Sequence, residues 1–302
     1  LGTGATKKVY KGYDTHKGIE IAWNIIDVSS VPESLRMQII TEIKILESCK
    51  DSSNYHIIKL YNNWFVKERE EVVLITEIYL SGTIQSFINR VKKIKIKTIK
   101  KWCKQILIAL NFLHKNDIIH RDIKCSNIFV NGNTGNIYLG DFGLSKKIDE
   151  ISSSIVGTPA FMAPEIYEEK YDKSIDIYAF GMCLLEMITN ESPYNECENI
   201  PQIWKKVTNN IKPVSLESVK NQNAKDLIIK CINYEKKNRP DIKNILNHIF
   251  FKNEKDEDEY IIINEELTIS ESMIFSKQKS SFDELEENGI ETDDSPKKNK
   301  IK

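Results

Sequence analysis

The chain has 302 residues with 43 basic and 44 acidic side chains, and 40% of its residues are hydrophobic. This length exceeds what one small core organises, so we expect two lobes or a domain with a tail. A formal charge of −1 gives no whole-chain reason to expect a nucleic acid or a membrane as partner. The longest apolar stretch, residues 175–189, contains two carboxylates and is too short to span a bilayer, so we expect no membrane insertion.

The six cysteines are scattered along the chain, and none of them forms a C-x-x-C pair. They are Cys49, Cys103, Cys125, Cys183, Cys197 and Cys231. This spacing argues against a metal or redox motif and favours separate thiols in a reducing compartment, so we expect a cytoplasmic location. The chain opens at Leu1 inside a glycine-rich motif, and we expect it to be an excerpt of a longer protein.

Hydrophobic periodicity predicts strands first and helices later. Apolar and polar residues alternate in four early segments, which is typical of strands. These segments are residues 9–14, 18–26, 61–66 and 71–79. Helical spacing predicts one helix between them, at residues 32–49, and a long helix later that carries Ile99 to Leu113 on one face and ends near Asn116.

The second half of the chain is predicted to be mainly helical. An Asn-Gly turn signal predicts a short hairpin over residues 128–143, and helical patterns continue to Phe251. Strands followed by helices indicate the α+β class. The basic run at residues 90–101 is interpreted as a solvated linker ahead of a helix, with a docking patch as the alternative. Residues 253–302 are acidic and polar, and we expect this tail to be mostly disordered or the start of an incomplete module.

The strongest functional signal is the segment HRDIKCSN at residues 120–127. DFG follows at residues 141–143, then GTPAFMAPE at residues 157–165, and then Arg239. This ordered set resembles the eukaryotic protein kinases over residues 1–251. Any one of these triplets alone would be a weak signal, but their order and spacing together are specific.

The resemblance implies a bilobal protein-kinase fold of the α+β class. A small β-rich N-lobe is expected at residues 1–79, and a larger helical C-lobe at residues 80–252, followed by the tail at residues 253–302. It also implies ATP and Mg²⁺ as cofactors and proteins as substrates. Lys124 in HRDIKCSN and Thr158 in GTPAF resemble serine/threonine kinases rather than tyrosine kinases.

Phosphoryl transfer requires positioning and charge neutralisation, which explains the residue types in these motifs. Asp122 is expected to accept the proton of the substrate hydroxyl, and Lys124 to steady the γ-phosphate. Asn127 and Asp141 are expected to supply the oxygen ligands that Mg²⁺ prefers. The alternative is that these polar residues are ordinary loop and turn formers.

The lysine of the family pattern V-A-I-K is missing. Its position holds Asn24, in the segment AWN, although the glutamate that normally pairs with this lysine is present as Glu42. Asparagine is short and neutral, so it can neither neutralise phosphate nor pair with a carboxylate. A cation must therefore come from elsewhere if the chain transfers phosphate.

The glycine-rich segment LGTGATKKVY offers that cation. Gly2, Gly4 and Val9 fit the family pattern G-x-G-x-x-G-x-V, and Lys7 stands at the third glycine. Residues two apart on a strand share a face, so Lys7 faces the nucleotide if Val9 does, and Lys8 points away. We therefore predict that Lys7 replaces the missing strand lysine; the alternative is a loop lysine in solvent.

This arrangement resembles the With-No-Lysine (WNK) branch of the kinases. The runs ITEIYLSGTIQSF, IIHRDIKCSNIFVNG and SIDIYAFGMCLLEM look like that branch, and AWN looks like its plant-type members. Phe142 departs from the branch, which usually has a leucine there that helps to line an inhibitory chloride site. By this resemblance the substrates are expected to include Ste20-like kinases.

The remaining predictions concern the nucleotide pocket and the supporting residues. Thr76 is expected at the back of the pocket, with backbone contacts to adenine from Glu77 and Tyr79. Further ATP contacts are expected from Ala22 and Phe129.

Three supports are predicted for the larger lobe. His120 is expected to pack beneath the DFG segment, and Asp176 to cap the backbone of the loop that carries HRD. Glu165 and Arg239 are expected to form a buried ion pair.

Ser154 is predicted to be an activating phosphorylation site. It lies between DFG and APE and matches the autophosphorylated serine of the WNK branch. A phosphate there would pair with the cation of Arg121 and order the loop that places Thr158. A flexible serine-rich linker is the alternative. The alternative to a catalytic function is a pseudokinase scaffold, and Asn24 is its only support.

Overall fold

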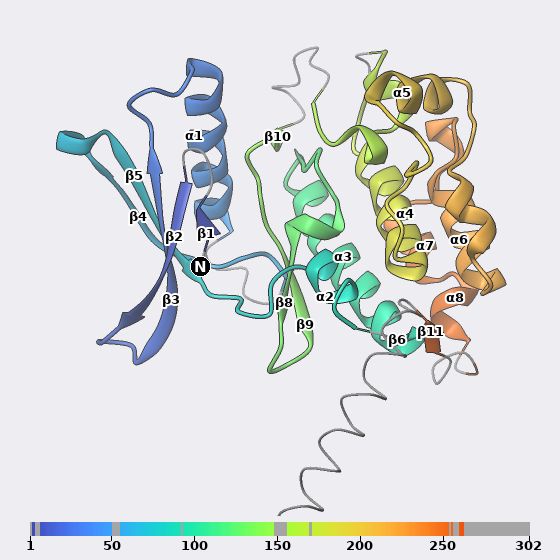
Figure 1. Ribbon diagram of the computed structural model, residues 1–302, viewed down its shortest axis with the longest axis horizontal. Helices are drawn as coiled ribbons and strands as arrows, with labels where there is room; N and C mark the ends of the chain where they lie inside the picture. Colours follow the sequence, from blue (N-terminus) through green and yellow to red (C-terminus); the bar gives the residue numbers. More distant parts are fainter. Residues whose placement is uncertain are drawn as a thin grey trace, which may run out of the picture. The chain divides into compact units, whose positions relative to one another are not determined.

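The alternating segments at the start of the chain form a five-stranded antiparallel sheet in the order β1-β2-β3-β5-β4 (Figure 1). Its strands are β1 (Gly2–Thr3), β2 (Lys7–Asp14), β3 (Ile19–Asp27), β4 (Leu60–Val66) and β5 (Glu71–Glu77). The four predicted strands are confirmed to within two residues at each end. The computed structural model describes residues 2–3, 7–49, 55–91, 93–147, 156–168, 171–253, 255 and 260–262.

Helix α1 (Glu33–Ser48) confirms the helix that was predicted between the strands. It begins directly after Pro32, and it buries Ile39, Ile45 and Leu46. These side chains join one hydrophobic core with Leu74 of β5. One face of the sheet is therefore covered by α1, and the side chains of that face are held in fixed positions.

Amphipathic and apolar helices build the second part of the molecule. They are α2 (Ile84–Ile88), α3 (Ile96–Lys115), α4 (Ser174–Thr189), α5 (Ile200–Thr208), α6 (Gln222–Cys231), α7 (Ile242–Leu246) and α8 (Ile249–Lys252). α3 buries the predicted face from Ile99 to Leu113, and α4, apolar on nearly all sides, is buried along most of its length. The α+β class is confirmed, with a β-rich lobe followed by a helical lobe. No helix in the described ranges is long and apolar enough to cross a membrane.

Short strand pairs complete the helical lobe, and 3₁₀ turns occur in both lobes, with η1 connecting β4 to β5. β7 (Ile118–Ile119) pairs with β10 (Lys146–Lys147), and β8 (Ile128–Asn131) pairs with β9 (Asn136–Leu139). The 3₁₀ turns are η1 (Lys67–Arg69), η2 (Cys125–Asn127), η4 (Pro159–Phe161), η5 (Pro164–Ile166), η6 (Val214–Ser218) and η7 (Lys236–Asn238). The predicted β8–β9 hairpin is confirmed. Asn131 Oδ1 closes its turn by accepting from the backbone N–H of Asn133 and Thr134, and Gly135 takes the left-handed conformation at φ 63°.

The basic run at residues 90–101 is not the linker that we expected. Lys93–Lys95 forms strand β6, α3 follows directly, and β6 pairs with β11 (Tyr260–Ile262) from the predicted tail (Figure 1). The lysine–isoleucine alternation explains this, because it gives the strand one apolar face, on which Ile94 is only 5% exposed. Residues 263–302 of the tail lie outside the described residues.

A buried ion pair joins Glu165 to Arg239 in the helical lobe. The guanidinium donates to both carboxylate oxygens at 2.5 and 2.8 Å, and the side chains of Arg239 and Glu165 are 1% and 8% exposed. The same guanidinium also donates to the backbone carbonyls of Asn233, Ser174 and Tyr234. Both charges are thus compensated, and removing one partner would leave the other charge buried without compensation.

We expect Arg239→Leu to lower the free energy of unfolding by about 3–5 kcal/mol, because Glu165 would stay buried without a cation. The matched control is Lys236→Leu, which removes a lysine from the exposed pair with Asp172, where the two side chains are 44% and 50% exposed. That variant should lose at most about 1 kcal/mol. Urea denaturation followed by circular dichroism measures both values, and equal losses in the two variants would contradict the assignment.

Candidate active site

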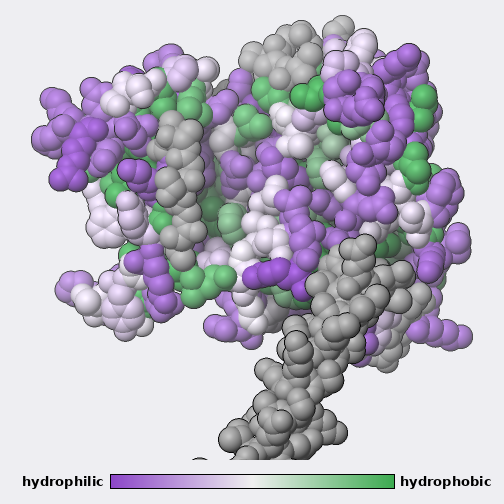
Figure 2. Space-filling model, viewed as in Figure 1, coloured by the Kyte–Doolittle hydropathy of each residue, from purple (hydrophilic) through white to green (hydrophobic). Residues whose placement is uncertain are grey.

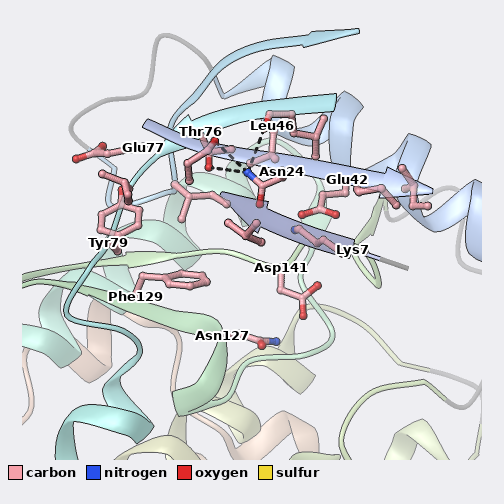
Figure 3. A pocket seen from close by; sticks show the side chains of 18 of the residues that line it. Lys7, Asn24, Glu42, Leu46, Thr76, Glu77, Tyr79, Asn127, Phe129 and Asp141 are labelled. Carbon is pink, nitrogen blue, oxygen red and sulfur yellow. Dashed lines mark hydrogen bonds between the residues drawn. The ribbon is translucent and has the colours of Figure 1, made fainter. Parts of the chain in front are cut away.

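A cavity of about 670 Å³ opens between the sheet, α1 and the β8–β9 hairpin (Figure 3). It brings together residues that were predicted from separate motifs. They are Lys7, Val9, Ala22, Asn24, Glu42, Thr76, Glu77, Tyr79, Asn127, Phe129 and Asp141. On the face in Figure 2, hydrophilic residues cover most of the surface, and hydrophobic residues form smaller patches, some of them in the recess between the two lobes.

The register of β2 and β3 decides which lysine faces this cavity. Val9 lies opposite Asn24, and Lys7 lies opposite Ile26. All four of these side chains line the cavity, whereas Lys8 is exposed. Figure 3 shows Lys7 extending toward Glu42 and Asp141. Lys7 therefore occupies the position that strand alternation predicts.

Glu42 of α1 lies close to two other charges of the cavity. Burial raises the pKa of its carboxyl, the charge of Lys7 opposes this by lowering that pKa, and the charge of Asp141 raises it. Burial prevails, so the pKa of Glu42 stays above its ordinary value. The three charged groups are electrostatically coupled within one region of the cavity.

Asn24 is tied into the sheet rather than free to reach a ligand with its amide nitrogen. The residue is 6% exposed, and Nδ2 lies 3.1 Å from the carbonyl of Leu74 and 3.2 Å from that of Ala22. The same nitrogen lies 3.2 Å from Oγ1 of Thr76, which is itself buried. Asn24 thus fixes the side chain of Thr76 at the back of the cavity, a role that was not predicted from the sequence.

Asp122 sits at the centre of a hydrogen-bonded cluster below the cavity. Its Oδ2 accepts from Lys124 Nζ at 2.8 Å and from Asn127 Nδ2 at 2.9 Å, and its Oδ1 accepts from Thr158 Oγ1 at 2.8 Å. Lys124 Nζ also donates to Thr158 Oγ1 at 2.8 Å. Three donors from two distant motifs, the HRD loop and GTPAF, therefore meet at the Asp122 carboxylate.

These contacts determine the charge of Asp122. Burial raises the pKa of its carboxyl, but the hydrogen bonds from Lys124, Thr158 and Asn127 together lower the pKa below its usual value. The carboxylate is therefore ionised at neutral pH and can accept a proton.

Asn127 and Asp141 present oxygen atoms to the same cavity. Asn127 Nδ2 donates to both the backbone carbonyl and the side chain of Asp122, at 2.9 Å each, so its amide oxygen is the atom left for another ligand. Within the described ranges no group of three or more His, Cys, Asp or Glu side chains could hold a metal ion. One amide oxygen and one carboxylate nevertheless fit Mg²⁺, which is commonly held by one or two protein oxygens together with the phosphates of its nucleotide.

His120 supports the DFG segment from below. Its Nε2 lies 3.1 Å from the carbonyl of Gly140, its Nδ1 accepts from the backbone N–H of Asp122, and its ring centre is 5.0 Å from that of Phe142. Burial lowers the pKa of His120. One nitrogen donates and the other accepts, which is the pattern of a neutral imidazole, so this residue packs and orients rather than transferring a proton.

Asp176 of α4 holds the backbone that leads to Asp122. Its oxygens accept from the N–H groups of His120 at 3.0 Å and Arg121 at 2.9 Å, and from His114 Nε2 at 2.9 Å. Burial raises the pKa of this carboxyl, but these partners lower the pKa by more than burial raises it. The carboxyl therefore stays charged although it is fully buried. Arg121 can thereby keep a left-handed φ of 68°, which is unfavourable for a side chain of this size.

The guanidinium of Arg121 lies under the DFG segment. It donates to the carbonyl of Leu144 and, at 3.0 Å, to the hydroxyl of Tyr171.

Gly2 is in β1 opposite Val9. The predicted residues Gly4 and Ser154 lie outside the described residues.

Aromatic rings form the floor of the cavity at its hinge end. Tyr79 stacks on Phe129 with ring centres 5.7 Å apart and lies 5.0 Å from the ring of Tyr138. The backbone N–H of Glu77 donates to the carbonyl of Lys59, so only its carbonyl is available to a ligand at that position. Val9 and other residues of the sheet also line the cavity.

Comparison with known proteins identifies this architecture. Residues 1–251 match the protein kinase domain family. The chain is 46% identical over 238 residues to the serine/threonine-protein kinase WNK8 of Arabidopsis thaliana, covering 77% of this chain and 42% of that protein. It is 44% identical over 256 residues to WNK3 of Mus musculus, covering 83% and 14%, and 41% identical over 260 residues to WNK4 of Homo sapiens, covering 84% and 21%.

The chain spans between 11% and 42% of the length of the curated relatives that it matches. The similarity nevertheless covers the cavity, the HRD loop and the ion pair described above. The chain therefore belongs to the protein kinase family, and its relatives assign it to the With-No-Lysine (WNK) branch of serine/threonine kinases.

Proposed function

We propose that this protein transfers the γ-phosphoryl group of ATP to serine and threonine hydroxyls of proteins, with Lys7 in place of the missing strand lysine. The observation that carries the proposal is the ionised Asp122, held by three donors beside a cavity that Lys7, Asn127 and Asp141 also face. A base, a cation and two oxygen ligands are the parts that phosphoryl transfer requires.

Asp122 is the proposed base. The hydroxyl of Thr158 donates to its Oδ1 at 2.8 Å, which supports this carboxylate as an acceptor for an alcohol hydroxyl. Lys124, which bonds both Asp122 and Thr158, would steady the transferred phosphate. This cluster of lysine and threonine supports serine and threonine as the acceptors.

Mg²⁺ and ATP complete the proposal. Asn127 and Asp141 would hold the ion, which supplies neutralisation of the phosphate charge when it is bound. Val9, Ala22 and Phe129 would enclose the adenine, with backbone contacts from Glu77 and Tyr79.

The wider setting belongs to the same proposal. The lobe boundary would fall between residues 79 and 80, and the helical lobe would end at residue 252. The substrates would be proteins, among them Ste20-like kinases, and the location cytoplasmic. A pseudokinase scaffold is the alternative, and only Asn24 favours it.

The position of the phosphate-binding cation can be tested directly. We expect Lys7→Met to reduce phosphoryl transfer by about 10²–10³-fold, the usual cost of removing one fixed charge donor to a developing anion. Lys8→Met is the matched control, since Lys8 is exposed, and Asn24→Ala should cost far less than Lys7→Met because the Asn24 side chain carries no charge. Radiolabelled phosphate transfer to a generic protein substrate gives the rates. Loss of activity in Lys8→Met with normal activity in Lys7→Met would reverse the assignment, and inactivity of the unaltered chain would favour the pseudokinase.

The role of Asp122 predicts a separation of binding from transfer. Asp122→Asn should leave the affinity for Mg-ATP within about threefold and reduce transfer by at least about 10²-fold, because the carboxylate acts on the acceptor hydroxyl. Calorimetric titration with Mg-ATP and the same transfer assay measure the two effects. A folded Asp122→Asn protein that transfers phosphate normally, or that no longer binds Mg-ATP, would be incompatible with the role.

Ser154 is the proposed phosphorylation switch, with Arg121 as its cation. The backbone of Gly157 lies close to that of Arg121, since a Cβ on this glycine would approach the carbonyl oxygen of Arg121 to 2.7 Å. Ser154 precedes Gly157 by three residues, which span at most about 10 Å. The guanidinium of Arg121 donates to Leu144 and Tyr171, so a phosphate on Ser154 would compete with these acceptors for it.

We expect mass spectrometry after incubation with Mg-ATP to find phosphate on Ser154 and activity to rise as it accumulates. The phosphate should be absent from Lys7→Met, which controls for contaminating kinases. Full activity in Ser154→Ala, with no phosphate at residues 152–158, would rule the switch out.

A further inference from the structure

Strand β6 has its partner outside the kinase domain. The family match ends at residue 251, and β11, which pairs with β6, starts at Tyr260. Within the described part of the chain, these two strands form a sheet of their own. A strand of the kinase domain is therefore completed by a segment that the domain itself does not contain.

The contact between the two strands has an apolar side. Ile94 is 5% exposed and belongs to the main hydrophobic core, and Ile261 lies directly opposite it and packs against that core. Side chains opposite each other in an antiparallel pair are on the same face. Ile261 is thus the apolar anchor of the segment.

The other side of the contact is aromatic and cationic. The ring centre of Tyr260 lies 4.7 Å from Lys93 Nζ and 5.3 Å from Lys95 Nζ. Such distances are typical of cation–π contacts. Tyr260 is still 47% exposed, so this half of the contact lies at the surface.

Charge is complementary between the two segments. Residues 90–104 contain eight lysine and arginine residues and no acidic residue, whereas residues 256–259 are all acidic and residues 265–266 are both glutamate. In sequence composition, the acidic residues before and after β11 are thus complementary in charge to the basic run that contains β6. Opposite charges favour encounter and register, and the effect weakens as salt rises.

A buried lysine of the same run holds the chain where it approaches β6. Lys100 is 2% exposed, and its Nζ donates to the carbonyl of Asn253, just after α8, and lies 5.5 Å from the ring centre of Phe250. This tether keeps the following segment at a high effective concentration near β6.

We propose that β6 and the basic start of α3 form a peptide-docking site, which takes an extended segment with an aromatic–aliphatic–aliphatic core and acidic flanks, and which the chain's own residues 260–262 occupy. Backbone pairing supplies the affinity, and the alternation of Ile94 with the two lysines supplies the selectivity. The contact comprises three residue pairs, so it opens without unfolding of the lobe. A segment of the same chemistry can then replace β11. None of the β6 residues lines the cavity, so docking is separate from the chemistry.

The test measures binding of a fluorescein-labelled synthetic peptide of residues 256–266 to the full chain. The unaltered chain should bind it weakly, because its own segment fills the site. Ile261→Asp, which removes the apolar anchor from that segment, should bind the peptide at least about tenfold more tightly. Tyr260→Ala is a second variant with the same expected direction. A peptide that itself carries Ile261→Asp should not bind.

The site itself is tested by charge reversal in the Ile261→Asp chain. Adding Lys93→Glu and Lys95→Glu should weaken peptide binding by about tenfold or more, whereas the matched pair Lys220→Glu and Lys243→Glu, exposed lysines elsewhere on the lobe, should leave it unchanged. Thermal melting and phosphate transfer should be the same in all of these variants, which confirms that they fold.

Hydrogen exchange gives an independent readout on the chain alone. The amides of residues 93–95 should exchange faster in Ile261→Asp than in the unaltered chain, and added peptide should slow them again. The docking site is overturned if these amides exchange equally in both chains, if Ile261→Asp binds the peptide no better than the unaltered chain, or if reversal of Lys93 and Lys95 has no effect.

Discussion

The loop that carries the HRD motif depends on one fully buried carboxylate. Asp176 accepts two backbone N–H groups and one imidazole N–H, and these three bonds keep it charged inside the helical lobe. A neutral residue of the same size could not compensate the two N–H groups equally well, because charge-assisted hydrogen bonds are the stronger kind. The strained backbone of Arg121 is held by this anchor, and Asp122 follows it directly. The position of the proposed base is therefore set by a residue of a distant helix.

Strand geometry is compatible with the proposed replacement of the β3 lysine by Lys7 within the same fold. Lys7 and Asn24 lie on neighbouring strands and face the same cavity, so a cation on either strand reaches the same space. Once the lysine is absent from β3, a small amide fits there and bonds to Leu74 and Thr76. Asn24 thus has a structural role, in which it fixes Thr76 at the back wall of the cavity.

Local sequence patterns predicted most of the fold and many of the residues that line the cavity. Alternation in LGTGATKKVY sufficed to separate Lys7 from Lys8, because a strand has only two faces. The sequence did not predict contacts whose partners lie far apart: Thr158 meets Asp122 only when the chain folds back, and β6 acquires its partner from residue 260 onward. The linker interpretation of residues 90–101 failed for this reason, since the strand character of three residues depends on a neighbour that no local window contains.

Two carboxylates beside the cavity show how the balance between burial and partners assigns different roles. Asp122 receives three hydrogen bonds, which outweigh burial and keep the pKa of its carboxyl low. For Glu42, burial and the charge of Asp141 disfavour the ionised carboxylate, and the charge of Lys7 favours it. Burial prevails, so the pKa of Glu42 is raised. Without Lys7 the pKa of Glu42 would rise further, and its carboxyl would take up a proton at a higher pH. The charge on α1 is thus tied to the lysine of the neighbouring sheet. The proposed phosphate-binding cation Lys7 therefore also stabilises the charged form of Glu42, which gives this glutamate a partner although β3 carries no lysine.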